Sequence, residues 1–352
     1  ALMFACQNGH DRVALQLIKA GAKVDQTKEG GWTALMLACF ENSDRCVLQL
    51  IEAGADVNKT EEDGWTALML ACQDGHDSSA LQLIKAGARV DPTSNRSGLT
   101  ALMLACQNGH YHVALHLIKA EAAVDTANKA GETALTQACR YGHAPCVLQL
   151  IEAGADLKKQ TANGFTALML ACGNGHDRVT LHLIKAGAKL DVANNNGFTA
   201  LMKACENGHD HVALQLIEAG AGVNHAATNG VTALIMACQN GHDRVALQLI
   251  KAGADVNKTE EDGWTALMFA CQDGHDSRAL QLIKAGARVD PTSNRSGLTA
   301  LMLACQNGHY HVALHLIKAE AAVDTANKAG ETALTQACRY GHAPCVLQLI
   351  EA

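Results

Sequence analysis

The chain has 352 residues, with 28 Lys and Arg against 35 Asp and Glu, 48% apolar residues and a formal net charge of −7. This apolar content excludes disorder over the whole chain. The net negative charge makes nucleic acid and anionic membranes poor candidates as partners. No apolar run approaches the roughly 20 residues of a transmembrane helix, so we expect no membrane insertion. Aromatic residues make up only 3%, and their positions are therefore informative.

The triplet Thr-Ala-Leu recurs every 33 or 34 residues, beginning at residues 33, 66, 100, 133, 166, 199, 232, 265, 299 and 332. Ala1-Leu2-Met3 continues the series without its Thr. Length alone would suggest two or three domains, but a fixed period of this size is typical of a repeat protein. The sequence therefore predicts eleven units in one continuous array over residues 1–352. Its first and last units are truncated, so we expect a segment of a longer protein.

One unit, residues 66–98, shows the elements that each repeat is expected to contain. Thr66 can cap a first helix that starts at residue 67, because its side chain can accept from a free N–H of the first turn. Gly75 breaks that helix, and Asp77 lies in the first turn of a second helix, where its charge suits the helix dipole. Gly87 stops the second helix, and a polar loop leads to the next Thr. The pattern predicts helix-turn-helix-loop units that must stack to bury their apolar faces.

These residues resemble the ankyrin repeat. The family pattern is seen best in Gly64-Trp-Thr-Ala-Leu-Met-Leu-Ala-Cys-Gln-Asp-Gly-His76 and in Gly253-Ala-Asp-Val-Asn257. The resemblance covers the whole chain and implies an all-α ankyrin-repeat solenoid, in which the units stack into a curved array. It also implies a recognition scaffold rather than one particular function.

Several positions depart from the family pattern in almost every unit. The family Pro is Ala, the family His is mostly Met, and the second Ala of the family pair is Cys, so we expect Met packing to replace part of the loop network. In the second helix, Leu and Gln reverse the usual order of a polar and an apolar residue. We interpret these leucines as part of a slightly rotated buried face, with an apolar docking strip near the convex edge as the alternative; they are residues 15, 48, 81, 115, 148, 181, 214, 247, 280, 314 and 347.

The 14 cysteines follow the repeat. Eleven occupy one repeated position, and Cys46, Cys146 and Cys345 each lie seven residues after one of these. Stacked equivalents should be about 8–10 Å apart, beyond the reach of a disulfide. We interpret them as small buried apolar residues in a reducing compartment, the cytoplasm or the nucleus. Only Cys46 with Cys39, and the equivalent pairs 139/146 and 338/345, could approach within one unit, and we expect no native disulfide.

Catalytic and metal-binding patterns do not stand out from the repeat. His112 and His116 are four residues apart on one expected helix, but the Glu of a zinc-protease motif and a third ligand are missing. No phosphate-binding glycine motif occurs, and no nucleophile lies beside a base outside the repeat pattern. We therefore expect no metal, no cofactor and no enzymatic activity.

A variable residue lies between the loop Gly and the Thr of each unit. It is apolar in most units, and the resemblance places it at a loop tip that faces a concave groove. A second variable position follows the first helix and carries Phe40, Tyr141 and Tyr340. An exposed row of aromatic residues suggests an interface, although each ring could instead pack on a neighbouring loop. The predicted partner-binding residues are Trp32, Phe40, Trp65, Leu99, Tyr141, Phe165, Phe198, Val231, Trp264, Leu298 and Tyr340.

Residues 53–153 recur as residues 252–352 with two differences: Leu70 becomes Phe269 and Ser79 becomes Arg278. Such identity indicates a recent internal duplication. It also predicts two equivalent surfaces, at which a bivalent partner would gain avidity.

The sequence thus predicts a protein-protein interaction module that binds a protein partner on its concave face through apolar loop tips, without catalysis. An alternative is the targeting or regulatory arm of a larger enzyme, such as a kinase or ubiquitin ligase, whose catalytic domain lies outside this segment. A third is a spacer or scaffold that has no discrete partner.

Overall fold

The structure is a computed structural model that describes residues 1–352, and it contains 22 α-helices and no strand. The chain forms two compact units. The first comprises residues 1–171 and 181–188, and the second comprises residues 172–180 and 189–352. The boundary falls in α11 (Ala167–Gly173) and α12 (Asp177–Lys185).

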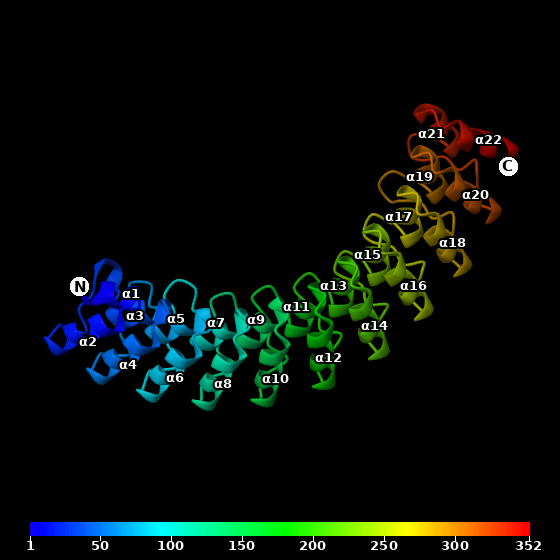
Figure 1. Cartoon of the computed structure of the whole chain (residues 1–352). Helices are drawn as coiled ribbons and strands as arrows, with labels where there is room; N and C mark the ends of the chain where they lie inside the picture. The colour runs from blue at the N-terminus through cyan, green and yellow to red at the C-terminus, as the bar shows by residue number, and fades with distance from the viewer. The chain divides into compact units, whose positions relative to one another are not determined.

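In the first compact unit, odd-numbered helices are the first helices of the repeats and even-numbered helices are the second. The first helices are α1 (Leu2–Gln7), α3 (Ala34–Phe40), α5 (Ala67–Asp74), α7 (Ala101–Gln107) and α9 (Ala134–Tyr141). The second helices are α2 (Asp11–Lys19), α4 (Asp44–Glu52), α6 (Asp77–Lys85), α8 (Tyr111–Lys119) and α10 (Ala144–Glu152). Each first helix packs on the next first helix and each second helix on the next second helix, which gives two helical layers (Figure 1).

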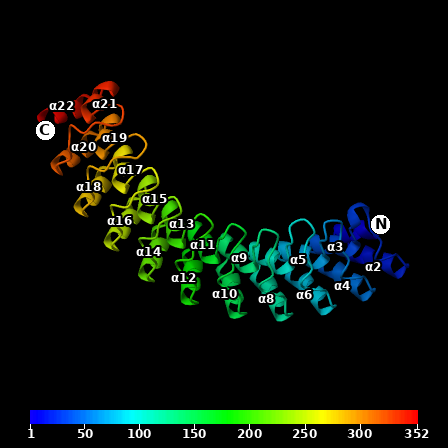
Figure 2. The same ribbon diagram turned by 180° about the vertical axis from the view of Figure 1, so that it is seen from behind.

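The second compact unit repeats this arrangement. Its first helices are α13 (Ala200–Glu206), α15 (Ala233–Gln239), α17 (Ala266–Gln272), α19 (Ala300–Gln306) and α21 (Ala333–Tyr340). Its second helices are α14 (Asp210–Glu218), α16 (Asp243–Lys251), α18 (Asp276–Lys284), α20 (Tyr310–Lys318) and α22 (Ala343–Glu351). Figure 2 shows the same two layers from behind, with the loops rising beyond the first helices. The predicted all-α solenoid of stacked helix pairs is confirmed, and that all eleven repeats form one continuous array stays a prediction.

The first helices begin where the Thr cap was predicted. Thr66 Oγ1 accepts a hydrogen bond from Met69 N at 3.2 Å, and Thr100 does the same for Met103. The cap satisfies one of the donors that a helix start leaves free. Every side chain from Ala101 to Cys106 is buried in α7, so the first helix forms the centre of the core.

The leucines of the second helices are not part of a buried face, and that interpretation is wrong. In α8 the buried residues are Val113, Ala114 and Leu117, whereas Leu115 is half-buried. A helix turns about 100° per residue, so Leu115 lies on the side away from Leu117 and Val113. None of the eleven leucines is buried; residues 48, 148, 181, 214 and 347 are exposed and the others are half-buried.

Adjacent repeats are also joined at both ends of their first helices. At the loops, backbone bonds connect one repeat to the next, as in Asn95 N to Asp63 O at 2.7 Å and Lys129 N to Ser97 O at 3.0 Å. At the other end, His110 Nε2 lies 3.0 Å from the carbonyl oxygen of Gln73 in the preceding repeat. The methionines that replace the family His are buried, except Met3, which is half-buried. Backbone bonds therefore connect neighbouring loops, and that Met packing replaces part of the loop network stays a prediction.

Candidate functional site

The predicted tip residues close tight turns between the loops and the first helices. Glu61 N donates to Trp65 O at 3.0 Å, and the Glu61 side chain accepts from Trp65 N at 2.8 Å. Gly64 takes φ 80° within this turn, in the left-handed region that glycine adopts without a steric cost. The turn fixes the backbone on which each tip side chain is presented.

The tip side chains are less exposed than the sequence suggests. Trp32 packs edge-on against Phe40 at the end of α3, with ring centroids 6.1 Å apart, and Lys28 Nζ lies 5.6 Å from the Trp32 ring. Packing within the same repeat therefore covers part of the Trp32 ring. The tips are all half-buried; they are Trp32, Trp65, Leu99, Phe165, Phe198, Val231, Trp264 and Leu298.

The predicted residues at the C-terminal ends of the first helices are the exposed ones. Phe40 is 45% exposed, Tyr141 49% and Tyr340 51%. Tyr141 is the last residue of α9, and its ring stacks on His143 with centroids 6.4 Å apart. About half of the Tyr141 surface therefore remains accessible.

Two predicted residues, Leu99 and Tyr141, line the same hollow. This hollow measures about 520 Å³ and lies between two adjacent repeats, over the loops that precede α7 and α9. Its lining consists of Ser97, Leu99, Gln107, Asn128, Glu132, Gln137, Arg140 and Tyr141. The hollow combines an apolar wall, an exposed aromatic edge and polar side chains.

A hydrogen-bond network around Glu132 organises the polar side of this hollow. The carboxylate accepts from Gln137 Nε2 at 2.7 Å and from Asn128 Nδ2 at 3.3 Å, and it forms an ion pair with Arg140. Asn128 Oδ1 in turn accepts from the backbone N–H groups of Ala130 and Glu132 at 2.9 Å. Gln137 is buried, so the network is anchored in the core and holds the Arg140 guanidinium beside Tyr141.

The second copy of the duplicated block builds the same network. Glu331 accepts from Gln336 Nε2 at 2.7 Å and from Asn327 Nδ2 at 3.3 Å, and it pairs with Arg339. These bonds, that from Asn327 above all, lower the pKa of the Glu331 carboxyl. The carboxylate therefore stays ionised and keeps the Arg339 side chain in place.

The sequence prediction missed the network while finding its neighbours. In the sequence, Glu132 is only a polar residue at a tip position that is apolar in most units, and Gln137 carries no binding motif. A signal was present, because Thr136-Gln137 replaces the Met-Leu that other repeats carry at this point of the first helix. A buried Gln in place of Leu needs a hydrogen-bond partner, and Glu132 is that partner.

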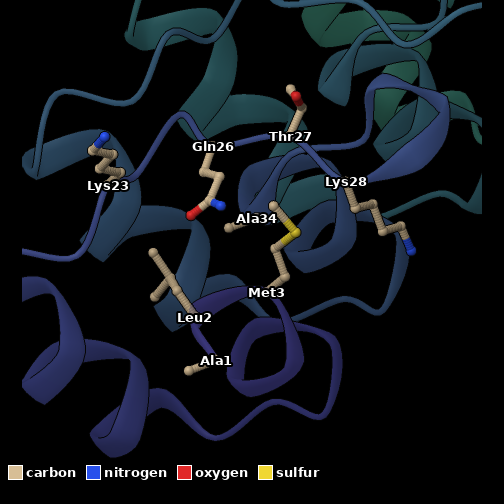
Figure 3. A pocket seen from close by; sticks show the side chains of 8 residues that line it. All are labelled: Ala1, Leu2, Met3, Lys23, Gln26, Thr27, Lys28 and Ala34. Carbon is tan, nitrogen blue, oxygen red and sulfur yellow. The ribbon is translucent and has the colours of Figure 1, made fainter.

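A second hollow, of about 290 Å³, lies beside α1 and the first loop (Figure 3). Met3 and Gln26 lie between Lys23 and Lys28 in this view. None of the predicted binding residues lines this hollow. No group of three or more His, Cys, Asp or Glu side chains is placed to hold a metal ion, and no helix has the length and apolar character needed to cross a membrane.

These features define an all-α protein built of stacked helix pairs. A model of the family of ankyrin repeats, built on three copies, matches residues 2–94, 82–161, 154–227, 213–293 and 277–352. The chain therefore belongs to the ankyrin-repeat family. A comparison with curated proteins finds no match. Ankyrin repeats are in general protein-protein interaction modules, and their fold is an interaction scaffold rather than a catalytic one.

Proposed function

We propose that this chain binds a protein partner, without catalysing a reaction, on the surface formed by its loop tips and the ends of its first helices. The observation that carries the proposal is the hollow between adjacent repeats, in which Leu99, Arg140 and Tyr141 converge. Tyr and Arg are the residue types that, with Trp, most often dominate the binding energy of an interface.

The network around Glu132 supports this proposal because it fixes the Arg140 side chain before a partner arrives. Ordering a long side chain on binding costs about 0.5–1.5 kcal/mol. A guanidinium that already pairs with a core-anchored carboxylate loses less freedom. Leu99, a half-buried tip, would help to exclude water from the contact.

The duplication extends the proposal to two equivalent sites. Glu331, Arg339 and Tyr340 repeat the arrangement of Glu132, Arg140 and Tyr141, one set in each compact unit. A partner that carries the recognised segment twice would bind both sites, and the second contact would raise its avidity. We further propose a reducing compartment, the cytoplasm or the nucleus, because all 14 cysteines are free thiols.

A paired substitution tests the binding surface. Tyr141→Ala with Tyr340→Ala removes the exposed aromatic residue from both sites, and Tyr111→Ala with Tyr310→Ala is the matched control. The control tyrosines are 40% exposed and start α8 and α20, away from the hollow. Proteins captured from a cell extract by the wild-type chain should fall at least about tenfold with the first variant, the equivalent of 1.4 kcal/mol, and persist with the second. Unchanged capture by a first variant with unchanged circular dichroism would contradict the proposal.

A further inference from the structure

Three repeats carry a second cysteine at the third position of the second helix. The sequence suggested that its thiol could approach the cysteine of its own repeat. In the structure it interacts with the core thiol of the preceding repeat. The pairs are Cys6 with Cys46, Cys106 with Cys146, and Cys305 with Cys345. All six side chains are fully buried, and each pair lies within one compact unit.

The register of the stacked helices explains this pairing. In the two repeats that carry a polar or charged residue other than Cys at the third position of the second helix, its side chain bonds to the preceding repeat. Ser79 Oγ donates to Asp44 Oδ1 at 2.6 Å, and Arg278 Nη1 donates to the carbonyl oxygen of Cys238 at 2.6 Å. Cys238 is the core cysteine of the preceding repeat. A Cys at the third position is therefore directed toward the preceding repeat, where its thiol interacts with the core cysteine.

We propose that these three thiol pairs are sites of oxidative cross-linking, which form the disulfides Cys6–Cys46, Cys106–Cys146 and Cys305–Cys345 in response to a small hydroperoxide. Each disulfide joins two adjacent repeats. Six other repeats have Val at the third position and lack the second thiol; these are residues 13, 113, 179, 212, 245 and 312. The cross-links would therefore restrain three particular junctions and leave the others unchanged.

The chemistry balances with hydrogen peroxide as the two-electron oxidant. One sulfur, as thiolate, attacks a peroxide oxygen, which cleaves the O–O bond, gives a sulfenic acid and releases hydroxide that takes up a proton to become water. The sulfur of the second thiol then attacks the sulfenic sulfur, the S–S bond forms, and the hydroxyl group leaves with the remaining thiol proton as a second water. Two thiols and one hydrogen peroxide become one disulfide and two waters.

Burial limits which oxidants can reach the sulfurs, and the pKa of each thiol sets the order in which the pairs react. Desolvation raises the pKa of Cys6 to about 12, so little thiolate exists there and its oxidation is slow. A hydrogen bond with Cys106 lowers the pKa of Cys146 instead. We expect the Cys106–Cys146 disulfide to form first. A large disulfide such as oxidised glutathione has no access to buried sulfur, whereas a peroxide of nearly the size of water reaches it during brief local opening.

Intact mass and peptide mapping of the full chain test the proposal. The folded chain is treated with hydrogen peroxide, denatured with an alkylating reagent and digested without reductant. Before alkylation we expect the intact mass to fall by about 2 Da per pair. After alkylation and digestion we expect linked peptides that contain the three named pairs, and loss of the links on reduction. The oxidised chain should also unfold at a higher temperature, because each link closes a long loop in the unfolded chain.

Two variants separate the pairs from other thiol oxidation. The triple variant Cys46→Val, Cys146→Val, Cys345→Val uses the residue found at this position in the other repeats and should form none of the three links. The control Cys72→Ala removes a buried core cysteine outside the pairs and should keep all three. The proposal is overturned by an unchanged mass, by gains of about 16 or 32 Da without links, by links between other cysteines, or by an equal thermal shift in the triple variant.

Discussion

Arg278 is a charged residue in the core, with only 1% of its surface exposed. Its Nε donates to Asp243 Oδ1 at 2.6 Å, Nη2 pairs with the same carboxylate, and Nη1 donates to the backbone of Cys238. The first copy of the duplicated block has Ser79 here, which donates to Asp44 in the same register. The same site is thus filled once by a neutral and once by a charged donor, each directed at the first-turn Asp of the preceding second helix.

Removing the partner of a buried charge costs more than removing the pair. We predict that Asp243→Ala destabilises the folded chain by about 2–3 kcal/mol, the worth of a hydrogen bond to a charged group, because the buried Arg278 guanidinium loses its charged partner. In an Arg278→Ser background, the same substitution should cost about 1 kcal/mol or less, as for a neutral hydrogen bond. Urea unfolding of the four proteins measures the coupling.

The equivalent change in the first copy is the internal control for this cycle. Asp44→Ala removes only the acceptor of Ser79, so its effect should match that of Asp243→Ala in the Arg278→Ser background. If Asp243→Ala were equally mild with and without Arg278, the ion pair would contribute nothing to stability.

At the scale of the helix, glycines with positive φ end both helices of a repeat, but their surroundings differ. Gly75 follows α5 with φ 75°, and a Cβ there would lie 2.3 Å from Nδ1 of His110 in the next repeat. Gly87 follows α6 with φ 85°, and nothing lies within 4 Å of its Cβ position. Two other repeats carry Glu121 and Glu320 at the position of Gly87, with φ of 61° and 62°. The second helix stop therefore accepts a side chain, whereas at Gly75 the ring of His110 leaves no room for one; Asn42, with φ 56°, takes the equivalent position in another repeat.

We predict that Gly87→Ala costs about 1–2 kcal/mol, the price of a left-handed conformation for a residue with a Cβ. Gly75→Ala should cost about 1–3 kcal/mol more, because the methyl group also displaces the His110 ring. Urea unfolding of both variants measures the difference. The double variant Gly75→Ala, His110→Ala should recover part of that excess, and equal costs for the two single substitutions would remove the steric argument.

The helices themselves follow from local sequence, and this is why they were predictable. Thr66 caps α5 and Asp77 opens α6 as expected, because capping and dipole effects act within one turn. The leucines of the second helices were misplaced, since the resemblance fixes the period but not which face turns inward. The interaction of Cys46 with Cys6 was not predicted, because it depends on the register between two repeats and not on spacing within one.

The candidate site, too, was only partly predictable from the sequence. Leu99 and Tyr141 were found because they vary at fixed positions of the repeat. Their half-burial or exposure could not be predicted, since it depends on neighbouring side chains such as the ring of Phe40 against Trp32. The network around Glu132 joins residues that are four, five and eight positions apart, and only the folded turn brings them together.

At the scale of the whole molecule, the core is built from Ala, Leu, Met and Cys, which explains the scarcity of aromatic residues. Thirteen of the 14 cysteines are buried. Desolvation raises the pKa of Cys172 and of Cys238 to about 12, and it raises the pKa of Cys72, Cys205 and Cys271 further. Thiols of this kind, repeated in both compact units, make the stability of the chain depend on alkaline pH.

The direction of that dependence follows from proton binding. An unfolded thiol loses its proton near pH 9, whereas Cys172 in the folded chain keeps its proton to about pH 12. Between these values the folded state binds more protons than the unfolded state, so stability falls as pH rises. Each such thiol should remove on the order of 1 kcal/mol per pH unit within this window and nothing below it. We predict a steep loss of unfolding free energy from pH 9 to 11, measured by urea unfolding.

A variant in which three core cysteines are replaced isolates the thiols from lysines and tyrosines, which titrate in the same range. Cys172→Ala, Cys205→Ala, Cys238→Ala changes residues that belong to one compact unit and supplies the Ala that is typical of the family at this position. The cavities left by the sulfurs should lower its stability at pH 7. Its loss of stability between pH 9 and 11 should be smaller than that of the wild type, because the unfolded chain then has three fewer protons to release. Parallel pH profiles for the two proteins would mean that other groups, and not the buried thiols, set the alkaline limit.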